Sequence, residues 1–489
     1  MGNTSASETF TGSLNTRTAL LGSSRSSSSR RLGGWRSSVV STAAVVSLLG
    51  GGVAVTTAPA SSAPAPTPSN SVPTPSPPTV GSSGVGSSQV LGSVADITPR
   101  SAVKLGEPMR EPAPYPTTPI DSGLQIGSLP ASTGQPMNVA PLDSRVGLSG
   151  ASKQFRFSYS TTNQHGQVAA STAALFLPKG TMPSGGWPVL AWAHGTVGLG
   201  DNCTPSMNPR SERDATYLNH WLNQGYAVVA SDYAGQGTEG LMSYLNGKST
   251  AANVVDSVIA ARKLAPVQGH LATRWAVIGQ SQGGGAALHV AQRATKASQA
   301  AGIDFRGTVT TGAPAYIENI VLAGGPTFPP VVLPTGLNVY ALYIMAALGD
   351  ARPDLNMDAI LTPEGKKMVK WAETACYAQM ADAVEGTNVA RAFKKPVRSI
   401  PGIQRALTEH MATATTGYDK PVFVGHGLQD KDVPTPIGLA LNSEMWLNQF
   451  LASPRNKRVV VRWYPTDHGE TVYASMKDST PFLAGILRP

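Results

Sequence analysis

The segment Gly279 to Gly283, with the sequence Gly-Gln-Ser-Gln-Gly, constrains this chain more than any other stretch. An apolar run, Trp275 to Ile278, precedes it, and an Ala- and Leu-rich helical stretch, Ala286 to Ala294, follows it. A strand, a sharp turn and a helix in this order hold a serine hydroxyl at the end of a sheet in a strained backbone conformation. Gly279 and Gly283 fit such a nucleophile elbow, because a Cβ there would collide with the neighbouring strand or helix. The pattern predicts that Ser281 is a nucleophile.

Short Val-rich runs alternate with amphipathic stretches along the rest of the chain. Phe155–Tyr159 and Ala169–Leu177 flank a turn and predict an antiparallel pair of strands. The later runs are typical of buried strands: Trp187–Trp192, Tyr226–Ala230, Trp275–Ile278, Gly307–Thr311, Val422–Val424 and Val459–Trp463. The predicted helices between them include Ala215–Gln224, Val254–Leu264 and Ala286–Ala300. This alternation predicts an α/β fold with a mainly parallel central sheet and helices on both faces, in one domain over residues 105–489.

The N-terminal part of the chain has a different composition. Basic residues precede an apolar run, Val39 to Val55, and Ala58-Pro59-Ala60 follows it, so residues 1–60 are predicted to be an export signal. An uncleaved membrane anchor is the alternative. Residues 61–104 are rich in Ser, Pro and Thr and predict a disordered linker, because they cannot bury enough apolar area to fold. Turns and prolines continue from Ala102 to Pro141, which we expect to be an arm packed on the domain surface.

The formal net charge of +9 does not predict nucleic-acid binding. Much of it comes from the N-terminal segment, where five arginines are offset by one glutamate: Arg17, Arg25, Arg30, Arg31, Arg36 and Glu8. The remaining positive charge is spread thinly over the chain. It favours an ordinary solvated surface, with association with an anionic membrane or cell-envelope surface as the alternative.

A glycine-bearing loop, Ala193 to Gly198, follows the predicted strand that ends at Trp192. Such a loop can direct a backbone N–H toward a developing oxyanion, and the residue after the nucleophile supplies a second N–H. We assign these two oxyanion donors to Thr196 and Gln282. His194 is expected to order the loop through a side-chain hydrogen bond rather than to act as a base.

A second polar loop, Gly425 to Pro434, follows the predicted strand Val422–Val424. It contains two candidates for a catalytic acid, Asp430 and Asp432. The spacing Gly-x-x-Asp-x-x-Val-Pro favours Asp430, and Asp432 is then a loop cap. His426 precedes the acid and is expected to pack near the end of the strand.

His468 follows the last predicted strand and is the only histidine after the Asp430 loop. The order Ser281, Asp430, His468 is that of the α/β-hydrolases. In such a triad the imidazole accepts the serine proton and later delivers it to the leaving group, while the carboxylate fixes the imidazole tautomer. No Cys, His and carboxylate spacing indicates a metal site.

Five segments together resemble the secretory lipase family of exported α/β-hydrolases: Ala193–Gly198, Ser231–Thr238, Gly279–Gly284, Gly427–Pro434 and Asp467–Gly469. The resemblance extends from about Asp121 to the C-terminus. It implies a serine esterase that acts on acylglycerols or other esters without a cofactor, with Ser281, Asp430 and His468 as its triad. It also implies that Asp232 and Tyr233 line or brace the site; a turn of structural importance only is the alternative.

The strand pattern stops between residues 316 and 418, where helix-like stretches take over. These are Val339–Leu348, Asp358–Met380 and Val384–Lys394. An insertion at this place in such hydrolases is a helical cap, which shields an apolar substrate from water. Four of its apolar residues either form an acyl channel or simply pack helices together: Tyr340, Tyr343, Ile344 and Met345.

The chain contains only two cysteines, Cys203 and Cys376. In an exported protein such a pair predicts a disulfide. This bond would join the loop after Gly198 to the cap.

The sequence therefore predicts a secreted serine ester hydrolase, a lipase or carboxylesterase, that cleaves lipophilic carboxylic esters through an acyl-enzyme on Ser281. An acyltransferase that uses the same acyl-enzyme is the nearest alternative in chemistry. A non-catalytic, envelope-associated binding protein on a hydrolase fold is an alternative of another class, and a peptidase is a third. The expected partner is a lipid or other ester substrate, at a membrane or envelope surface or free in the extracellular space.

Overall fold

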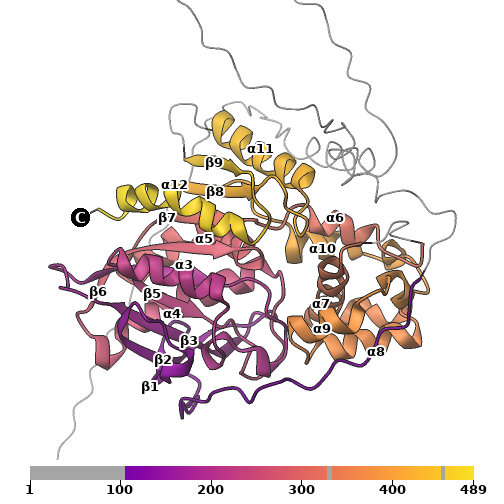
Figure 1. Cartoon of the computed structure of the whole chain (residues 1–489), viewed down its shortest axis with the longest axis horizontal. Helices are drawn as coiled ribbons and strands as arrows, with labels where there is room; N and C mark the ends of the chain where they lie inside the picture. Colours follow the sequence, from indigo (N-terminus) through magenta and orange to yellow (C-terminus); the bar gives the residue numbers. More distant parts are fainter. Residues whose placement is uncertain (1–104, 328–332, 453–457, 489) are drawn as a thin grey trace, which may run out of the picture. The chain divides into compact units, whose positions relative to one another are not determined.

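The computed structural model describes residues 105–327, 333–452 and 458–488. The predicted export signal, its alternative as an anchor, and the linker up to residue 104 lie outside the described residues. Within those residues the strands form one mixed sheet in the order β1-β2-β3-β5-β4-β6-β7-β8-β9 (Figure 1). None of the helices in the described ranges combines the length and the apolar character that crossing a bilayer would need.

The first three strands of the sheet are antiparallel: β1 (Pro136–Pro141), β2 (Ala151–Thr162) and β3 (Val168–Pro178). Strands β2 and β3 confirm the predicted antiparallel pair. Strand β1 corrects the prediction of a surface arm, because its residues pair with β2 instead of only packing on the domain. The strand was not predicted because it has a proline at each end, and prolines argue against a strand. An edge strand nevertheless tolerates prolines that a central strand would exclude.

The remaining six strands run parallel, as the sequence predicts: β4 (Trp187–Ala193), β5 (Ala227–Ser231), β6 (Leu271–Gln280), β7 (Asp304–Thr311), β8 (Val422–Gly427) and β9 (Val459–Tyr464). Their carboxyl ends therefore meet at one edge of the sheet. The loops that leave this edge carry the polar segments singled out from the sequence. In α/β sheets this edge is the ordinary location of a ligand site.

Helices cover both faces of the sheet. On one face, α3 (Glu212–Asn223) and α12 (Glu470–Ile486) bury side chains such as Trp221 and Leu483 against the sheet. On the other face lie α4 (Gly247–Lys263), α5 (Gln282–Ala300) and α11 (Thr435–Ala452). The apolar faces of the parallel strands are thus shielded from water on both sides, as the Val-rich runs require.

The described residues between β7 and β8 form five α-helices: α6 (Ile317–Leu322), α7 (Thr335–Ala351), α8 (Pro363–Ala372), α9 (Tyr377–Val384) and α10 (Ile403–Met411). Helix α7 confirms the apolar helix predicted around Val339–Leu348. The predicted helix over Asp358–Met380 is wrong as one unit, because α8 ends at Ala372 and α9 begins only after Cys376. The break occurs where Cys376 forms an isolated β-bridge with Gly198.

The predicted helix over Val384–Lys394 is also wrong. Only a short 3₁₀ turn, Val389–Ala392, forms there. Gly386 has a φ of +71°, which ends the helical path after α9. Asn388 then accepts a hydrogen bond from the Ala390 N–H at 2.9 Å, so its side chain starts a new turn instead of continuing a helix.

The structure confirms the disulfide between Cys203 and Cys376, whose Cα atoms are 5.4 Å apart. Beside it, the Tyr377 N–H donates to the Val197 carbonyl at 2.9 Å. Both cysteines are buried. The segment that opens α9 is therefore fastened to the loop after β4 by a covalent bond and by backbone pairing.

Replacing both cysteines with serine should lower the free energy of unfolding by about 2–5 kcal/mol, because the disulfide restricts a long loop in the unfolded chain. The cysteines are 173 residues apart in the sequence. Urea unfolding of the oxidised protein, the reduced protein and the double variant measures the loss. A reduced protein as stable as the oxidised one would contradict this account of the disulfide.

Candidate active site

The chain turns sharply at Ser281, between β6 and α5. Its backbone has φ 57° and ψ −124°, an unusual conformation for a residue with a side chain. The Ser281 N–H donates to the Thr311 carbonyl of β7 at 2.9 Å, and its own carbonyl accepts from Gly285 at 3.1 Å. These two bonds hold the strained turn in place and leave the side chain at the carboxyl edge of the sheet.

The glycines beside Ser281 stand where no side chain fits. A Cβ built on Gly279 would lie 2.2 Å from the Gly283 carbonyl oxygen. A Cβ built on Gly283 would lie 1.9 Å from the carbonyl oxygen of Ala193, at the end of β4. The backbone of the turn therefore packs directly against the loop that follows β4.

Asp430 and His468 form a buried pair. The His468 Nδ1 lies 2.7 Å from the Asp430 Oδ2. The other carboxylate oxygen, Oδ1, accepts backbone N–H groups from Asp432 at 3.0 Å and Val433 at 2.8 Å. The second ring nitrogen of His468, Nε2, is buried and has no hydrogen-bond partner in the described part of the chain. It is thus placed to accept a proton.

Asp432 has a different environment. Its Oδ1 accepts a hydrogen bond at 2.7 Å from the hydroxyl of Tyr340, on α7. Burial and the nearby Asp432 carboxylate raise the pKa of Tyr340, which therefore stays protonated as the donor. Asp432 thus links the loop after β8 to the helices between β7 and β8, while Asp430 holds the imidazole. Of the two aspartates, Asp430 is the one whose carboxylate contacts the imidazole of His468.

Gly312 lies against the imidazole of His468 and next to the residue that binds the strained turn, and it was not among the residues predicted from the sequence. Its φ is +55°, and it directly follows Thr311, whose carbonyl binds the Ser281 N–H. A Cβ at Gly312 would lie 2.6 Å from the His468 Cε1. The ring of His468 therefore rests on the backbone of the residue next to the Ser281 contact. A glycine immediately after a buried strand was the available signal.

The loop after β4 lies beside the turn. A Cβ on Gly195 would be 3.6 Å from the Ser281 Cβ. His194 is buried, and its Nδ1 lies 2.8 Å from the Gly195 carbonyl, which makes it the donor of a bond that orders the loop. Burial lowers the pKa of His194, so the ring is neutral at ordinary pH. The Thr196 hydroxyl shares a 2.8 Å hydrogen bond with the Tyr244 hydroxyl.

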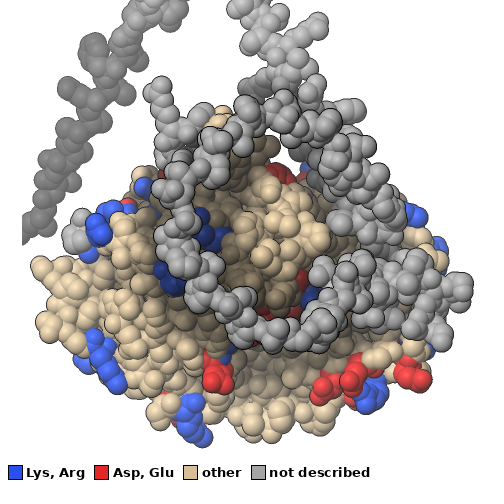
Figure 2. Space-filling view, turned by 45° about the horizontal axis from the view of Figure 1, so that its top comes forward, with Lys and Arg blue, Asp and Glu red and all other residues tan. Residues whose placement is uncertain are grey.

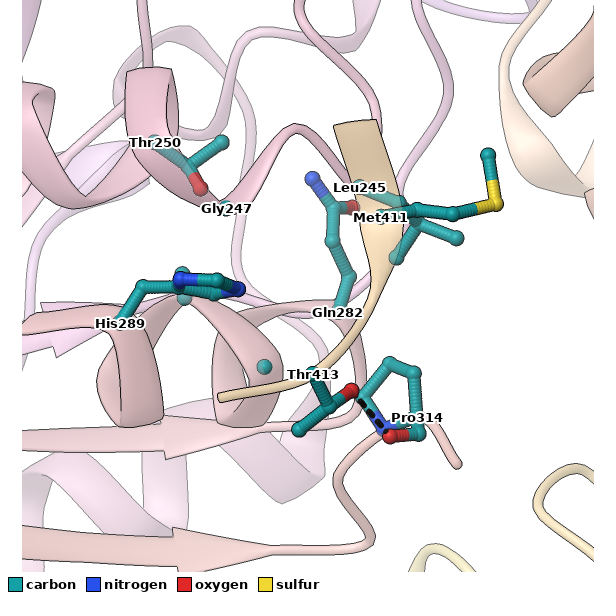
Figure 3. A pocket seen from close by; sticks show the side chains of 10 residues that line it. Leu245, Gly247, Thr250, Gln282, His289, Pro314, Met411 and Thr413 are labelled. Carbon is teal, nitrogen blue, oxygen red and sulfur yellow. Dashed lines mark hydrogen bonds between the residues drawn. The ribbon is translucent and has the colours of Figure 1, made fainter. Parts of the chain in front are cut away.

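Gln282 is the first residue of α5, where backbone N–H groups have no partner within the helix. Its side chain turns away to a small pocket, which also contains His289 and Met411 (Figure 3). Its backbone N–H is that of the residue immediately after Ser281. Gln282 thus adjoins Ser281 at the start of α5, while Thr196 belongs to the loop after β4, whose Gly195 lies beside Ser281.

Asp232 and Tyr233 are fully buried and lie beside the loop after β4. The Asp232 carboxylate is fully buried and accepts hydrogen bonds from Thr172 at 2.6 Å and from the Ser206 N–H at 2.8 Å. The Tyr233 ring stacks on His194 with centroids 4.3 Å apart, and its hydroxyl donates to the His194 carbonyl at 3.2 Å. The pair supports the loop after β4.

His426 was expected to pack near the end of its strand. His426, in β8, donates from Nε2 to the Val433 carbonyl at 3.2 Å, and its Nε2 lies 3.8 Å from the Asp430 Oδ2. Burial lowers its pKa. It supports the loop that carries Asp430.

The ligand atoms of Asp430, Asp432 and His468 lie within 4.8 Å of one another, a grouping that can hold a cation. These atoms are also engaged with protein groups: Nδ1 of His468 with Asp430, and the Asp432 carboxylate with Tyr340. The same arrangement therefore fits a hydrogen-bonded pair of a carboxylate and an imidazole as well as it fits a cation site.

Two histidines, the buried His410 and the half-buried His289, tie α10 to the core. The His410 Nε2 donates to the Tyr244 carbonyl at 3.0 Å, and the His289 Nε2 donates to the Ala412 carbonyl at 3.2 Å. Burial lowers the pKa of each ring to about 4. Both rings are therefore neutral donors at neutral pH.

Gly283→Ala should unfold or severely destabilise the protein, by several kcal/mol, because backbone atoms cannot move aside for the new methyl group. The matched control is Gly485→Ala in α12, where an added Cβ meets nothing within 4 Å. The control should be neutral or slightly stabilising. Thermal unfolding of both variants measures the difference; equal melting temperatures would contradict the packing described for the turn.

The free energy of unfolding should fall as the pH drops from about 6.5 to about 4, because the unfolded chain binds protons at His410 and His289 before the folded chain does. Below that range these two groups should add no further slope. His410→Gln should flatten the dependence, while His270→Gln, outside this contact, should not. Urea unfolding at a series of pH values measures it; an unchanged slope in His410→Gln would contradict the assignment.

Comparisons with known proteins bear on the family and the fold. The secretory lipase family model matches residues 210–448, a range that contains Ser281 and Asp430 but not His468. No curated protein sequence matches the chain.

Solved structures share the fold. Candida antarctica lipase A in its closed state has a TM-score of 0.57 and 19% identity, over 78% of this chain and 87% of that chain. The rice cell wall degrading esterase LipA from Xanthomonas oryzae has a TM-score of 0.58 and 19% identity, over 73% of this chain and 100% of that chain. The fold is thus the predicted α/β-hydrolase fold, and residues 210–448 match the model of the secretory lipase family.

Proposed function

We propose that this hydrolase of the lipase and esterase type is a serine ester hydrolase that forms an acyl-enzyme on Ser281. The observation that carries the proposal is the buried His468–Asp430 pair, with its 2.7 Å contact and an unpartnered Nε2. This pair rests on Gly312, and Gly312 is the neighbour of the carbonyl that binds the Ser281 N–H. Nucleophile, base and acid then have the mutual roles of a catalytic triad.

The chemistry follows from these roles. The His468 Nε2 accepts the Ser281 proton as the serine oxygen attacks the ester carbonyl, and the resulting imidazolium is stabilised by the Asp430 carboxylate. The same proton then passes to the leaving alcohol, which leaves an acyl group on Ser281. Water, deprotonated by His468, attacks the acyl group and releases the acid. Because the Asp430 Oδ1 is held by two backbone N–H groups, its Oδ2 stays directed at the imidazole.

The oxyanion that forms during each attack needs donors fixed in advance. We assign this role to the backbone N–H groups of Gln282 and Thr196. The Gln282 N–H belongs to the first turn of α5, where the helix dipole also favours a negative charge. The hydrogen bond between Thr196 and Tyr244 fixes the loop that carries the second donor.

The helices α6–α10 are proposed to form a cap over the substrate. Helix α7 is apolar on most of its surface, with Tyr343, Ile344 and Met345 buried, and Tyr340 contacts Asp432. Such an environment fits a lipophilic ester better than a polar one. These residues would then both pack the cap helices together and line the substrate site next to the loop that carries Asp430.

Export is the compartment we propose. A buried disulfide between the only two cysteines suits an oxidising environment outside the cytosol. The basic and apolar pattern of residues 1–60 supplies the signal for it.

A fluorophosphonate probe tests the proposed nucleophile. The wild-type protein should be labelled on Ser281 and should hydrolyse p-nitrophenyl esters of graded chain length, while Ser281→Ala should lose both properties. Peptide mass spectrometry locates the label. Labelling that persists in Ser281→Ala, or a folded wild-type protein without labelling, would refute the proposal.

Asp430→Asn should reduce kcat by roughly 10³–10⁴-fold, because an amide cannot hold the imidazole in the productive tautomer. Asp432→Asn should cost about tenfold or less, since an asparagine oxygen still accepts the Tyr340 hydrogen bond. Steady-state hydrolysis of one ester by both variants measures the contrast. If the two effects were exchanged, Asp432 would be the acid.

A further inference from the structure

Helix α11 exposes large apolar side chains on the side away from the sheet. Its opposite side is already buried, where Leu441 and Met445 join the core against β8 and β9. The exposed residues have relative accessibilities of 39–69%, and they form what we name the α11 face: Leu439, Trp446, Leu447, Phe450 and Leu451. The rings of Trp446 and Phe450 stack with centroids 5.5 Å apart. A helix that is apolar on both sides is normally covered on both sides.

The α11 face carries no charge. The only ionisable side chain of the helix is Glu444, whose carboxylate accepts hydrogen bonds from Tyr316 at 2.6 Å and from Thr415 at 3.0 Å. In Figure 2, which turns the top of Figure 1 forward, the uncovered surface is mostly uncharged, and most Lys, Arg, Asp and Glu side chains lie toward its edges. A partner recognised through ion pairs does not fit the α11 face.

The size of the α11 face argues against a second copy of the chain. Eighteen helical residues form a strip about 27 Å long and about 10 Å wide, or roughly 300 Å². A stable dimer buries about 800 Å² on each partner. A lipid surface, in contrast, needs only one apolar strip lying along it, and aromatic side chains such as Trp446 are suited to its boundary.

The α11 face also lies next to the candidate active site in the chain. Helix α11 begins at Thr435, directly after the loop that carries Asp430. Within that loop Leu428 is 48% exposed, two residues before Asp430. An apolar surface that starts at the acid loop would bring the site to a phase where lipophilic esters are concentrated.

We propose that the α11 face docks on an uncharged lipid surface and inserts Trp446, Leu447 and Phe450 among the acyl chains. The benefit to catalysis rests on the proposed function, whereas the docking itself does not. Because the α11 face is uncharged, docking should be as strong on phosphatidylcholine as on anionic lipid and should not weaken in high salt. Docking driven by the chain's net charge of +9 would behave in the opposite way.

The test uses the full chain with Ser281→Ala, so that lipid is not cleaved and a failure of the proposed chemistry does not affect the result. Phe450→Cys is labelled with an environment-sensitive fluorophore and mixed with phosphatidylcholine vesicles. The matched control is Met182→Cys, labelled in the same way, because Met182 is an exposed apolar residue outside α11. The label at 450 should shift to the blue and be quenched by brominated phosphatidylcholine, and the label at 182 should do neither.

A second variant checks the affinity. Trp446→Ser combined with Leu447→Ser should lower the partition coefficient onto phosphatidylcholine vesicles at least about tenfold, since it removes the two central apolar groups. The proposal is overturned if the label at 450 is unchanged by vesicles, or if it responds only to anionic lipid and only at low salt. It is also overturned if light scattering shows a dimer that the double substitution dissociates while vesicle binding is unaffected.

Discussion

The arrangement depends on backbone packed against backbone at the turn after β6. Gly283 lies so close to the Ala193 carbonyl that no side chain fits between them, and Ser281 is forced to a φ of 57°. That contact joins the two loops that approach the serine. It has a cost in backbone strain, which the hydrogen bonds to Thr311 and from Gly285 offset. The position of the serine is therefore a property of the sheet and not of a flexible loop.

Much of this could be predicted from the sequence, because the parallel strands are short, Val-rich and separated by helical stretches. Their carboxyl ends necessarily meet at one edge of the sheet, and the segments that carry Ser281, Asp430 and His468 all follow this edge. The preference for Asp430 over Asp432 rested on spacing alone. The structure supplies the physical difference, since one carboxylate holds an imidazole and the other holds Tyr340 of α7.

What could not be predicted depends on contacts between segments far apart in the chain. Strand β1 forms because β2 offers it a partner, although its prolines argue against a strand. The break before α9 exists because Cys376 pairs with Gly198 and Cys203, whereas helix propensity alone favours one long helix. Gly312 acquires its importance only when the ring of His468 is placed over it. Local sequence cannot contain such information.

A crystal structure of the protein after reaction with a lipid-like phosphonate ester tests the assignment of Ser281, His468 and Asp430 as a catalytic triad. The triad assignment predicts continuous density from the Ser281 Oγ to phosphorus, with the phosphoryl oxygen within hydrogen-bond distance of the Gln282 N–H. It also predicts the His468 Nε2 beside the serine oxygen. An adduct on another residue, or His468 directed away from the bound phosphonate, would contradict it.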